Sequence, residues 1–110
     1  MPYSQRDIVL VDFPFTDLVG SKLRPALIIS TTLVNHSGDF ICIQITSKEF
    51  DDGMFVPIQD DFLTTPLKLK RGIRMNKVFT VNKTRVIKKI STLKPLAFQL
   101  LEEFFQKIVF

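Results

Sequence analysis

The hydrophobic period of this sequence changes once, at Pro95. Beyond it, apolar residues recur three and four positions apart, at Leu96, Ala97, Leu100, Leu101, Phe104, Phe105 and Ile108. This spacing predicts an amphipathic helix over residues 95–108, with Pro95 in its first turn. Before Pro95 the apolar stretches are short and rich in β-branched residues, as is typical of strands. The chain is therefore predicted to form an α+β domain, with a small, strongly curled antiparallel sheet and one C-terminal helix.

Five or six strands are expected before the helix, arranged mostly as a meander. Turn residues delimit them at 7–13, 24–30, 40–47, 54–58, 72–76 (extended or resumed at 79–81) and 85–90. The run from Ala26 to Ile29 is too apolar to be half exposed, so it predicts a central strand that is covered on both faces. Pro57 has no N–H to donate, which places its strand at a sheet edge or puts Pro57 at a strand end. Residues 31–39 form a connection with room for a turn of helix.

A length of 110 residues suits one domain, 1–110, with one core. The only cysteine, Cys42, lies in an apolar run and is expected to be a small buried residue. The only histidine, His36, lies in a polar loop without a second ligand at metal-binding spacing, so neither a metal nor a cofactor is expected. A catalytic role for His36 stays open. With no signal sequence and no membrane-spanning run, a cytoplasmic protein is expected.

Basic residues are concentrated between Lys68 and Lys89. The window contains Lys68, Lys70, Arg71, Arg74, Lys77, Lys83, Arg85, Lys88 and Lys89, and no Asp or Glu. A field of one sign suits an anionic partner, most commonly a nucleic acid. The alternative is a solvated edge strand that its lysines protect against aggregation.

Arg24 stands where the second predicted strand begins, immediately before Pro25. Proline fixes its own φ and restricts the residue before it to extended geometry, so the backbone at Arg24 is stiff. A guanidinium stays charged at neutral pH and presents a fork of donors that suits phosphate. Arg24 is thus a candidate anion-binding residue, and the alternative is an arginine that caps a strand in solvent.

Four segments, taken together in this order, resemble the MazF/PemK-like toxins of type II toxin–antitoxin systems. They are residues 7–13 with the loop that follows, Arg24-Pro25-Ala26-Leu27-Ile28-Ile29-Ser30, Gln44-Ile45-Thr46-Ser47, and residues 80–85 followed by 90–93. The resemblance extends from about Asp7 to Leu101. It implies a small SH3-like barrel with a C-terminal helix, assembled as a homodimer. It also implies a metal-independent endoribonuclease that cuts single-stranded RNA, and a cognate antitoxin that occupies the RNA groove.

The chemistry that the resemblance implies is attack of the ribose 2′-hydroxyl on the adjacent phosphorus, which leaves a 2′,3′-cyclic phosphate and a 5′-hydroxyl. Arg24 matches the arginine at the scissile phosphate, and Thr46 matches a hydroxyl at the end of the third strand, with Ser47 able to supply a second hydrogen bond. The alternative for Thr46 and Ser47 is a strand end that bonds its own turn. Arg74 matches a basic position on the fifth strand.

Other residues are assigned to the RNA groove by the same resemblance. They are Ser21, Lys22, Thr31, Asn76, Lys77 and Arg85, with Lys70 adding charge, and Phe15 as a base-stacking residue or, alternatively, a loop anchor folded into the core. Asn76 stands where some family members place an acid, and it cannot act as a general base. Either a water held by Thr46 or His36 serves as the base, or the activity is weak or lost.

Two other functions remain open at this stage. CcdB-like toxins share the architecture but poison DNA gyrase through the C-terminal helix, without catalysis. A catalytically degenerate RNA-binding relative is the other alternative, and Asn76 is its best support.

Overall fold

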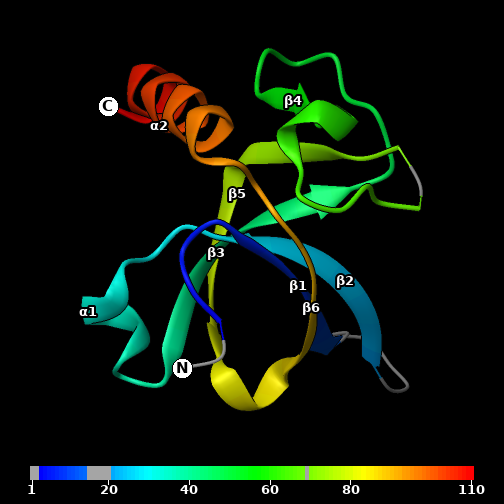
Figure 1. Cartoon of the computed structure of the whole chain (residues 1–110). Helices are drawn as coiled ribbons and strands as arrows, with labels where there is room; N and C mark the ends of the chain where they lie inside the picture. Colours follow the sequence, from blue (N-terminus) through cyan, green and yellow to red (C-terminus); the bar gives the residue numbers. More distant parts are fainter. Residues whose placement is uncertain (1–2, 15–20, 69) are drawn as a thin grey trace.

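The structure is a computed structural model that describes residues 3–14, 21–68 and 70–110. In these ranges the chain forms β1 (Asp7–Pro14), β2 (Ser21–Ile28), α1 (Thr32–Asn35), β3 (Asp39–Thr46), β4 (Phe55–Pro57), β5 (Gly72–Asn82), β6 (Val86–Thr92) and α2 (Pro95–Val109). Two 3-10 turns, η1 (Asp60–Phe62) and η2 (Lys83–Arg85), precede β5 and β6 respectively. Helix α2 lies along one side of the curled sheet (Figure 1).

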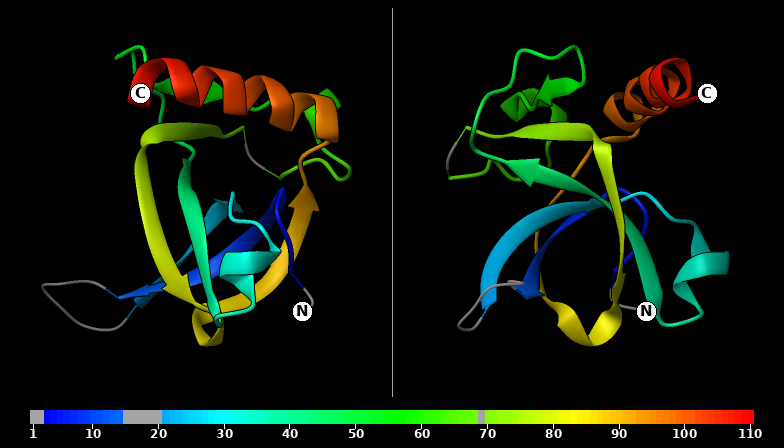
Figure 2. Two further views of the ribbon diagram at one scale, coloured as in Figure 1. Left: turned by 90° about the vertical axis from the view of Figure 1, so that its left-hand side faces the viewer. Right: turned by 180° about the vertical axis from the view of Figure 1, so that it is seen from behind.

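All strand pairs are antiparallel, in the order β4-β5-β3-β2-β1-β6. The predicted α+β fold, a small curled sheet with a C-terminal helix, is confirmed. The meander holds only for β1 to β3, because the long strand β5 pairs with β3 and leaves β4 at the sheet edge. Strand β6 then pairs with β1, which the curvature of the sheet allows (Figure 2). Pro57 is the last residue of that edge strand, as its missing N–H predicted.

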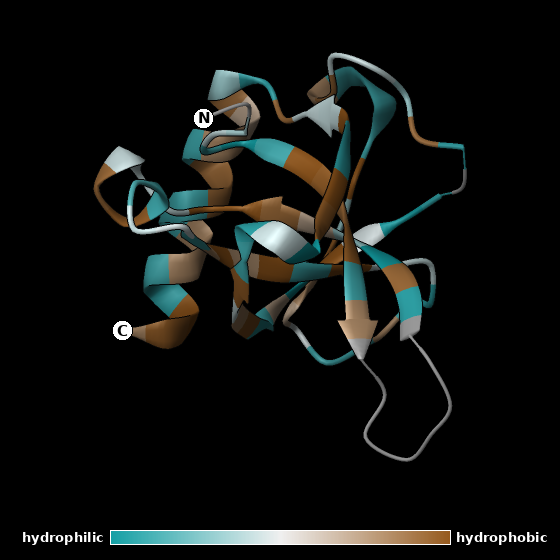
Figure 3. Cartoon of the chain, turned by 90° about the horizontal axis from the view of Figure 1, so that it is seen from below, coloured by the Kyte–Doolittle hydropathy of each residue, from teal (hydrophilic) through white to brown (hydrophobic). Residues whose placement is uncertain are grey.

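The second half of β2 is buried on both faces because it separates two apolar clusters. Ala26 and Ile28 pack in a cluster enclosed by the curl of the sheet, while Leu27 packs in a second cluster that includes Leu101 of α2. Ala26, Leu27 and Ile28 are all fully buried, which confirms that this part of β2 is the predicted central strand. Figure 3 shows hydrophobic stretches along the strands, and both hydrophobic and hydrophilic residues on α2.

The start of β2 differs from the prediction. The strand begins at Ser21 rather than at Arg24, because its pairing with β1 continues out to the Pro14–Ser21 pair. Lys22 and Leu23 are exposed, so this extension lacks the run of buried apolar residues by which the sequence predicted the strand. Arg24 therefore lies within a strand that is paired with β1, opposite Val11.

Helix α2 runs from Pro95 to Val109, with the proline in its first turn, as predicted. Leu101 is its buried residue, while Leu96 and Leu100 of the same apolar face are 69% and 55% exposed. The apolar stripe of the helix is thus wider than the surface that the sheet covers. No helix in the described part of the chain is both long and apolar enough to cross a bilayer.

The connection from β2 to β3 contains the expected turn of helix, α1. A buried polar network fixes it to the sheet: the Ser30 hydroxyl donates to Asn35 Oδ1, and Asn35 Nδ2 donates to the Ser30 carbonyl at 3.1 Å. The Ser30 hydroxyl also accepts the N–H of Ile41 at 3.0 Å. Since both side chains are buried, each polar atom needs such a partner.

Candidate functional site

Pro25 marks the point at which the sheet splits. Just after β2, the N–H of Ile29 donates to the carbonyl of Ile41 of β3. Backbone N–H groups point alternately to the two sides of a strand, so the backbone nitrogen of Pro25, four residues earlier, also faces β3. Pro25 has no N–H to offer there, and the β2–β3 ladder covers only the residues from Ala26 to Ile28. The β1–β2 hairpin continues without β3 beyond this point, and the two diverge in Figure 2.

Arg24 and Thr46 lie on the two sides of this split. Ala26 pairs with Gln44, and two residues further along each strand stand Arg24 and Thr46, on the same face and at the same end of the sheet. Both are half-buried. Thr46 Oγ1 accepts the N–H of Lys48 at 3.1 Å, which is the local turn contact named above as the alternative. A hydroxyl that accepts this bond can still donate one of its own.

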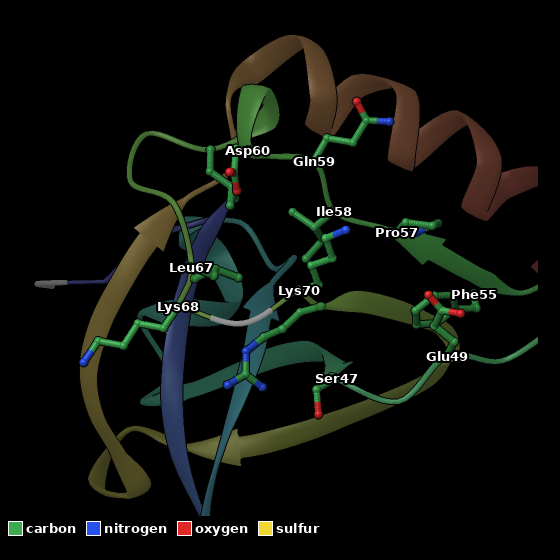
Figure 4. Close-up of a pocket in the computed structure, with 12 residues that line it drawn as sticks. Ser47, Glu49, Phe55, Pro57, Ile58, Gln59, Asp60, Leu67, Lys68 and Lys70 are labelled. Carbon is green, nitrogen blue, oxygen red and sulfur yellow. The ribbon is translucent and has the colours of Figure 1, made fainter.

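A cavity of about 510 Å³ opens at the end of β3, directly after Thr46. We call it the β3-end pocket (Figure 4); it is lined by Ser47, Glu49, Phe55, Pro57, Ile58, Gln59, Asp60, Leu63, Leu67, Lys68, Lys70 and Arg71. Two residues assigned from the sequence, Ser47 and Lys70, therefore meet at one site. The pocket combines cationic side chains, a hydroxyl, an aromatic ring and acceptor groups, which is a composition suited to a nucleotide.

Arg74 lies under the loop of residues 47–54. Its guanidinium carbon is 3.6 Å from the centroid of the Phe50 ring, and its Nη2 is 3.5 Å from Asp52 Oδ2. Only 15% of the side chain is exposed. In this arrangement Arg74 fastens the loop and does not line the β3-end pocket, so its catalytic role stays a prediction.

Asn76 and Lys77 are exposed at a bulge of β5. Ile43 of β3 pairs with Val78 and Ile45 with Ile73, so residues 74–77 of β5 lie opposite Gln44 alone. A bulge of this size bends the strand sharply, as Figure 2 shows for β5.

Lys22 and Arg85 lie by the β1–β2 hairpin, across the split from the β3-end pocket. Lys22 pairs with Phe13, and Arg85 Nη1 donates to the carbonyl of Asp12 at 3.3 Å. Phe15 lies outside the described residues, and of Ser21 only the backbone is described, at the start of β2.

Thr31 and His36 line a different cavity, of about 520 Å³, between α1 and residues 3–6. Neither residue joins the β3-end pocket, so the structure gives His36 no place as a base beside Thr46. Cys42 is fully buried, and this burial raises the pKa of its thiol from 9.0 to about 12, because desolvation disfavours the thiolate. Among the described residues, no group of three His, Cys, Asp or Glu is placed to hold a metal ion.

The basic residues between Lys68 and Lys89 are divided among several elements and do not all line one site. Lys68, Lys70 and Arg71 line the β3-end pocket, whereas Lys89 lies on β6 with its Nζ 3.9 Å from Asp7 Oδ1. Of the twelve lining residues, only Ser47 and Lys70 were assigned to the site from the sequence. Arg71 stood in the basic window and could have been found, but nothing in the sequence marked Glu49 or Phe55.

An open, curled antiparallel sheet with one C-terminal helix, split beside a pocket lined by three cationic and two acidic residues, defines a small barrel-like protein. The sequence profile of the family described as "PemK-like, MazF-like toxin of type II toxin-antitoxin system" matches residues 4–109. The chain therefore belongs to this toxin family, as the resemblance implied.

Solved structures share the fold at low sequence identity. A chain of the MazE–MazF complex from Deinococcus radiodurans aligns with a TM-score of 0.79 at 12% identity, covering 99% of this chain and 97% of that one. An endoribonuclease in complex with its cognate antitoxin, from a mycobacterial species, aligns at 0.77 and 14% identity, over 96% and 92%. The Mycobacterium tuberculosis toxin MazF-mt6 aligns at 0.73 and 19%, over 93% and 94%. No curated protein matches the sequence.

Proposed function

We propose that this toxin is an endoribonuclease that cuts single-stranded RNA without a metal ion. The observation that carries the proposal is the placement of Arg24 and Thr46 on the two sides of the split at Pro25, with the β3-end pocket, which contains Lys68, Lys70 and Arg71, directly after Thr46. Family membership supports it, because similar solved structures are named endoribonucleases.

The substrate supplies its own nucleophile. The ribose O2′ forms a bond to the adjacent phosphorus, the bond from phosphorus to O5′ breaks, and the products are a 2′,3′-cyclic phosphate and a 5′-hydroxyl. The proton of the 2′-hydroxyl goes to a base, and the leaving oxygen gains a proton. Arg24 neutralises charge on the phosphorane, which is the role of a fixed cation at a developing oxyanion.

Thr46 and Ser47 supply hydroxyls at the same end of the sheet, where they hydrogen-bond the phosphate or the 2′-hydroxyl. Asn76 cannot take the proton, and His36 lines a separate cavity. A water molecule held by Thr46 is therefore the base that this arrangement favours.

A cognate antitoxin and a second copy of the chain are the partners that we propose. Solved relatives include a MazE–MazF complex and an endoribonuclease in complex with its cognate antitoxin. Exposed apolar residues on α2, with Leu96 and Leu100 foremost, offer surface for such contacts.

The test is to incubate the purified protein with a long single-stranded RNA in EDTA. We expect cleavage with cyclic-phosphate ends, and a loss of at least about 100-fold in rate for Arg24→Ala. Lys107→Ala, on the exposed surface of α2, is the matched control and should cut like the wild type. A wild-type protein that leaves the RNA intact, or an Arg24→Ala variant of full activity, would refute the mechanism.

A catalytically degenerate RNA-binding protein is the second candidate, because Asn76 replaces an acid. It would bind the same RNA and leave it uncut, so a binding measurement beside the cleavage assay separates the two functions. None of the structural relatives described above favours the gyrase-poisoning alternative.

A further inference from the structure

An aromatic ring lies one strand away from Thr46. Gly72 of β5 pairs with Thr46 on one side and with Pro57 of β4 on the other, so the three residues form one row across the sheet. A Cβ built on Gly72 would lie 2.1 Å from Cζ of Phe55. The tip of the Phe55 ring therefore covers Gly72 on the face that carries Thr46, about 5 Å or one strand spacing away.

The Phe55 ring is supported from behind by other side chains. The centroids of the Phe50 and Phe55 rings are 6.2 Å apart, and the guanidinium of Arg74 in turn lies over the Phe50 ring. The half-buried Phe55 also lines the β3-end pocket. A ring held in this way can offer a flat apolar surface to a ligand without first being ordered, which reduces the entropy cost of binding.

Glu49 brings an acceptor to the same pocket. It is exposed and belongs to the loop of residues 47–54, which Arg74 fastens through Phe50 and Asp52. Figure 4 shows Glu49 and Phe55 on the same side of the pocket. An ionised carboxylate only accepts hydrogen bonds, so Glu49 can pair with N–H groups but not with carbonyl oxygens.

We propose that the β3-end pocket holds the nucleobase next to the scissile phosphate, with Phe55 as its stacking surface and Glu49 as the group that reads its edge. This inference rests on the proposed ribonuclease function. Lys70 and Arg71, in the same pocket, bind the flanking phosphate. A volume of about 510 Å³ lies within the range of about 300–1,000 Å³ common for small-ligand sites.

The chemistry of Glu49 sets the base that the pocket takes. Adenine, cytosine and guanine each present an amino group at the Watson–Crick edge, and guanine places a ring N–H beside it, which matches the two oxygens of a carboxylate. Uracil presents a single N–H between two carbonyl oxygens, and these would face the negative charge of Glu49. The pocket therefore selects an amino-bearing base, guanine foremost, and rejects uracil.

The experiment is to let the wild type and Glu49→Gln cut a pool of RNAs with randomised sequence and to sequence the new ends. We expect uracil to be depleted about tenfold at one fixed position beside the wild-type cut. In Glu49→Gln this depletion should disappear, because an amide both donates and accepts and so tolerates uracil. Glu103→Gln, on the exposed surface of α2, should keep the wild-type profile.

Phe55 is tested in the same pool. Phe55→Leu should lower the cutting rate of all sequences about tenfold while the base preference is kept, because stacking does not distinguish bases. Phe55→Tyr, which keeps an aromatic ring, should restore the cutting rate. If Glu49→Gln cuts too slowly to sequence, its binding to matched RNAs that carry guanine or uracil, with a 2′-deoxy sugar at the cut, gives the same comparison.

A wild type that cuts RNA without any position depleted in uracil overturns the base pocket alone, as does a Glu49→Gln variant with an unchanged preference. A wild type that cuts no RNA overturns the ribonuclease proposal instead.

Discussion

Gly72 is a position where a neighbouring side chain requires the absence of a Cβ. The tip of the Phe55 ring occupies the space that a Cβ would fill, at 2.1 Å. We expect Gly72→Ala to lower the free energy of unfolding by about 1–3 kcal/mol, because the ring must move out of a supported position. Urea unfolding followed by circular dichroism measures the change.

The matched control for this change is the same substitution in a Phe55→Ala background. With the ring removed, Gly72→Ala should be neutral or stabilise the strand by up to about 1 kcal/mol, because alanine has less backbone entropy to lose. An equal cost in both backgrounds would show that the Phe55 ring is not the cause.

At the level of single residues, the sequence pointed to Arg24, Thr46, Ser47 and Lys70, but it did not show how they are arranged. Pro25 was interpreted as a stiffener of the backbone at Arg24. In the structure it also ends the β2–β3 ladder, because its missing N–H faces β3. The direction of that N–H follows from strand pairing, which the sequence does not specify.

At the scale of elements, α2 packs against the sheet through a narrow part of its apolar face. Leu101 is 7% exposed and lies in the cluster shared with the sheet, whereas its neighbour Leu100 is 55% exposed. We expect Leu101→Ala to cost about 2–4 kcal/mol of unfolding free energy and Leu100→Ala less than about 1 kcal/mol. Chemical denaturation of the two variants provides the comparison.

An equal cost for both leucines would contradict the exposed position of Leu100 in the single chain, and it would indicate that this side of α2 contacts the second copy that we propose. The helical period of residues 95–108 predicted the helix and its apolar face. It could not predict which leucines are covered, because coverage depends on the width of the sheet beneath.

Unlike α2, whose period predicted the helix, the loop of residues 47–54 has nothing in its sequence that marks it as part of a site. Its position depends on the contacts of Arg74 with Phe50 and Asp52, which are 24 and 22 residues away along the chain. The resemblance assigned Arg74 to catalysis, which stays a prediction, and the structure adds its contacts with Phe50 and Asp52. Contacts between residues so distant in sequence arise only when the sheet has formed.

For the whole molecule, the distribution of charge decides how RNA affinity responds to salt. Each phosphate contact on single-stranded RNA contributes about 0.7 to the slope of log K against log salt concentration, because a counterion is released. We expect Lys70→Ala, in the β3-end pocket, to reduce the slope by about that amount. Fluorescence anisotropy of a labelled, non-cleavable RNA at several salt concentrations measures it.

Lys89→Ala is the control for this measurement, because Lys89 lies on β6 near Asp7 and away from the β3-end pocket. It should leave the slope unchanged. A slope that falls equally for Lys70→Ala and Lys89→Ala would indicate diffuse attraction to the whole chain rather than a defined RNA path.

By itself the sequence determined the fold class, the central place of β2, the edge position of Pro57, the C-terminal helix and the family. These follow from local properties: hydrophobic period, the covalent geometry of proline, and short motifs in a fixed order. The tertiary structure alone decided that β5 rather than β4 pairs with β3, that the sheet splits at Pro25, and that Glu49 and Phe55 share a pocket with Ser47 and Lys70. These are outcomes of long-range pairing and of the curvature of the sheet, and no local pattern encodes them.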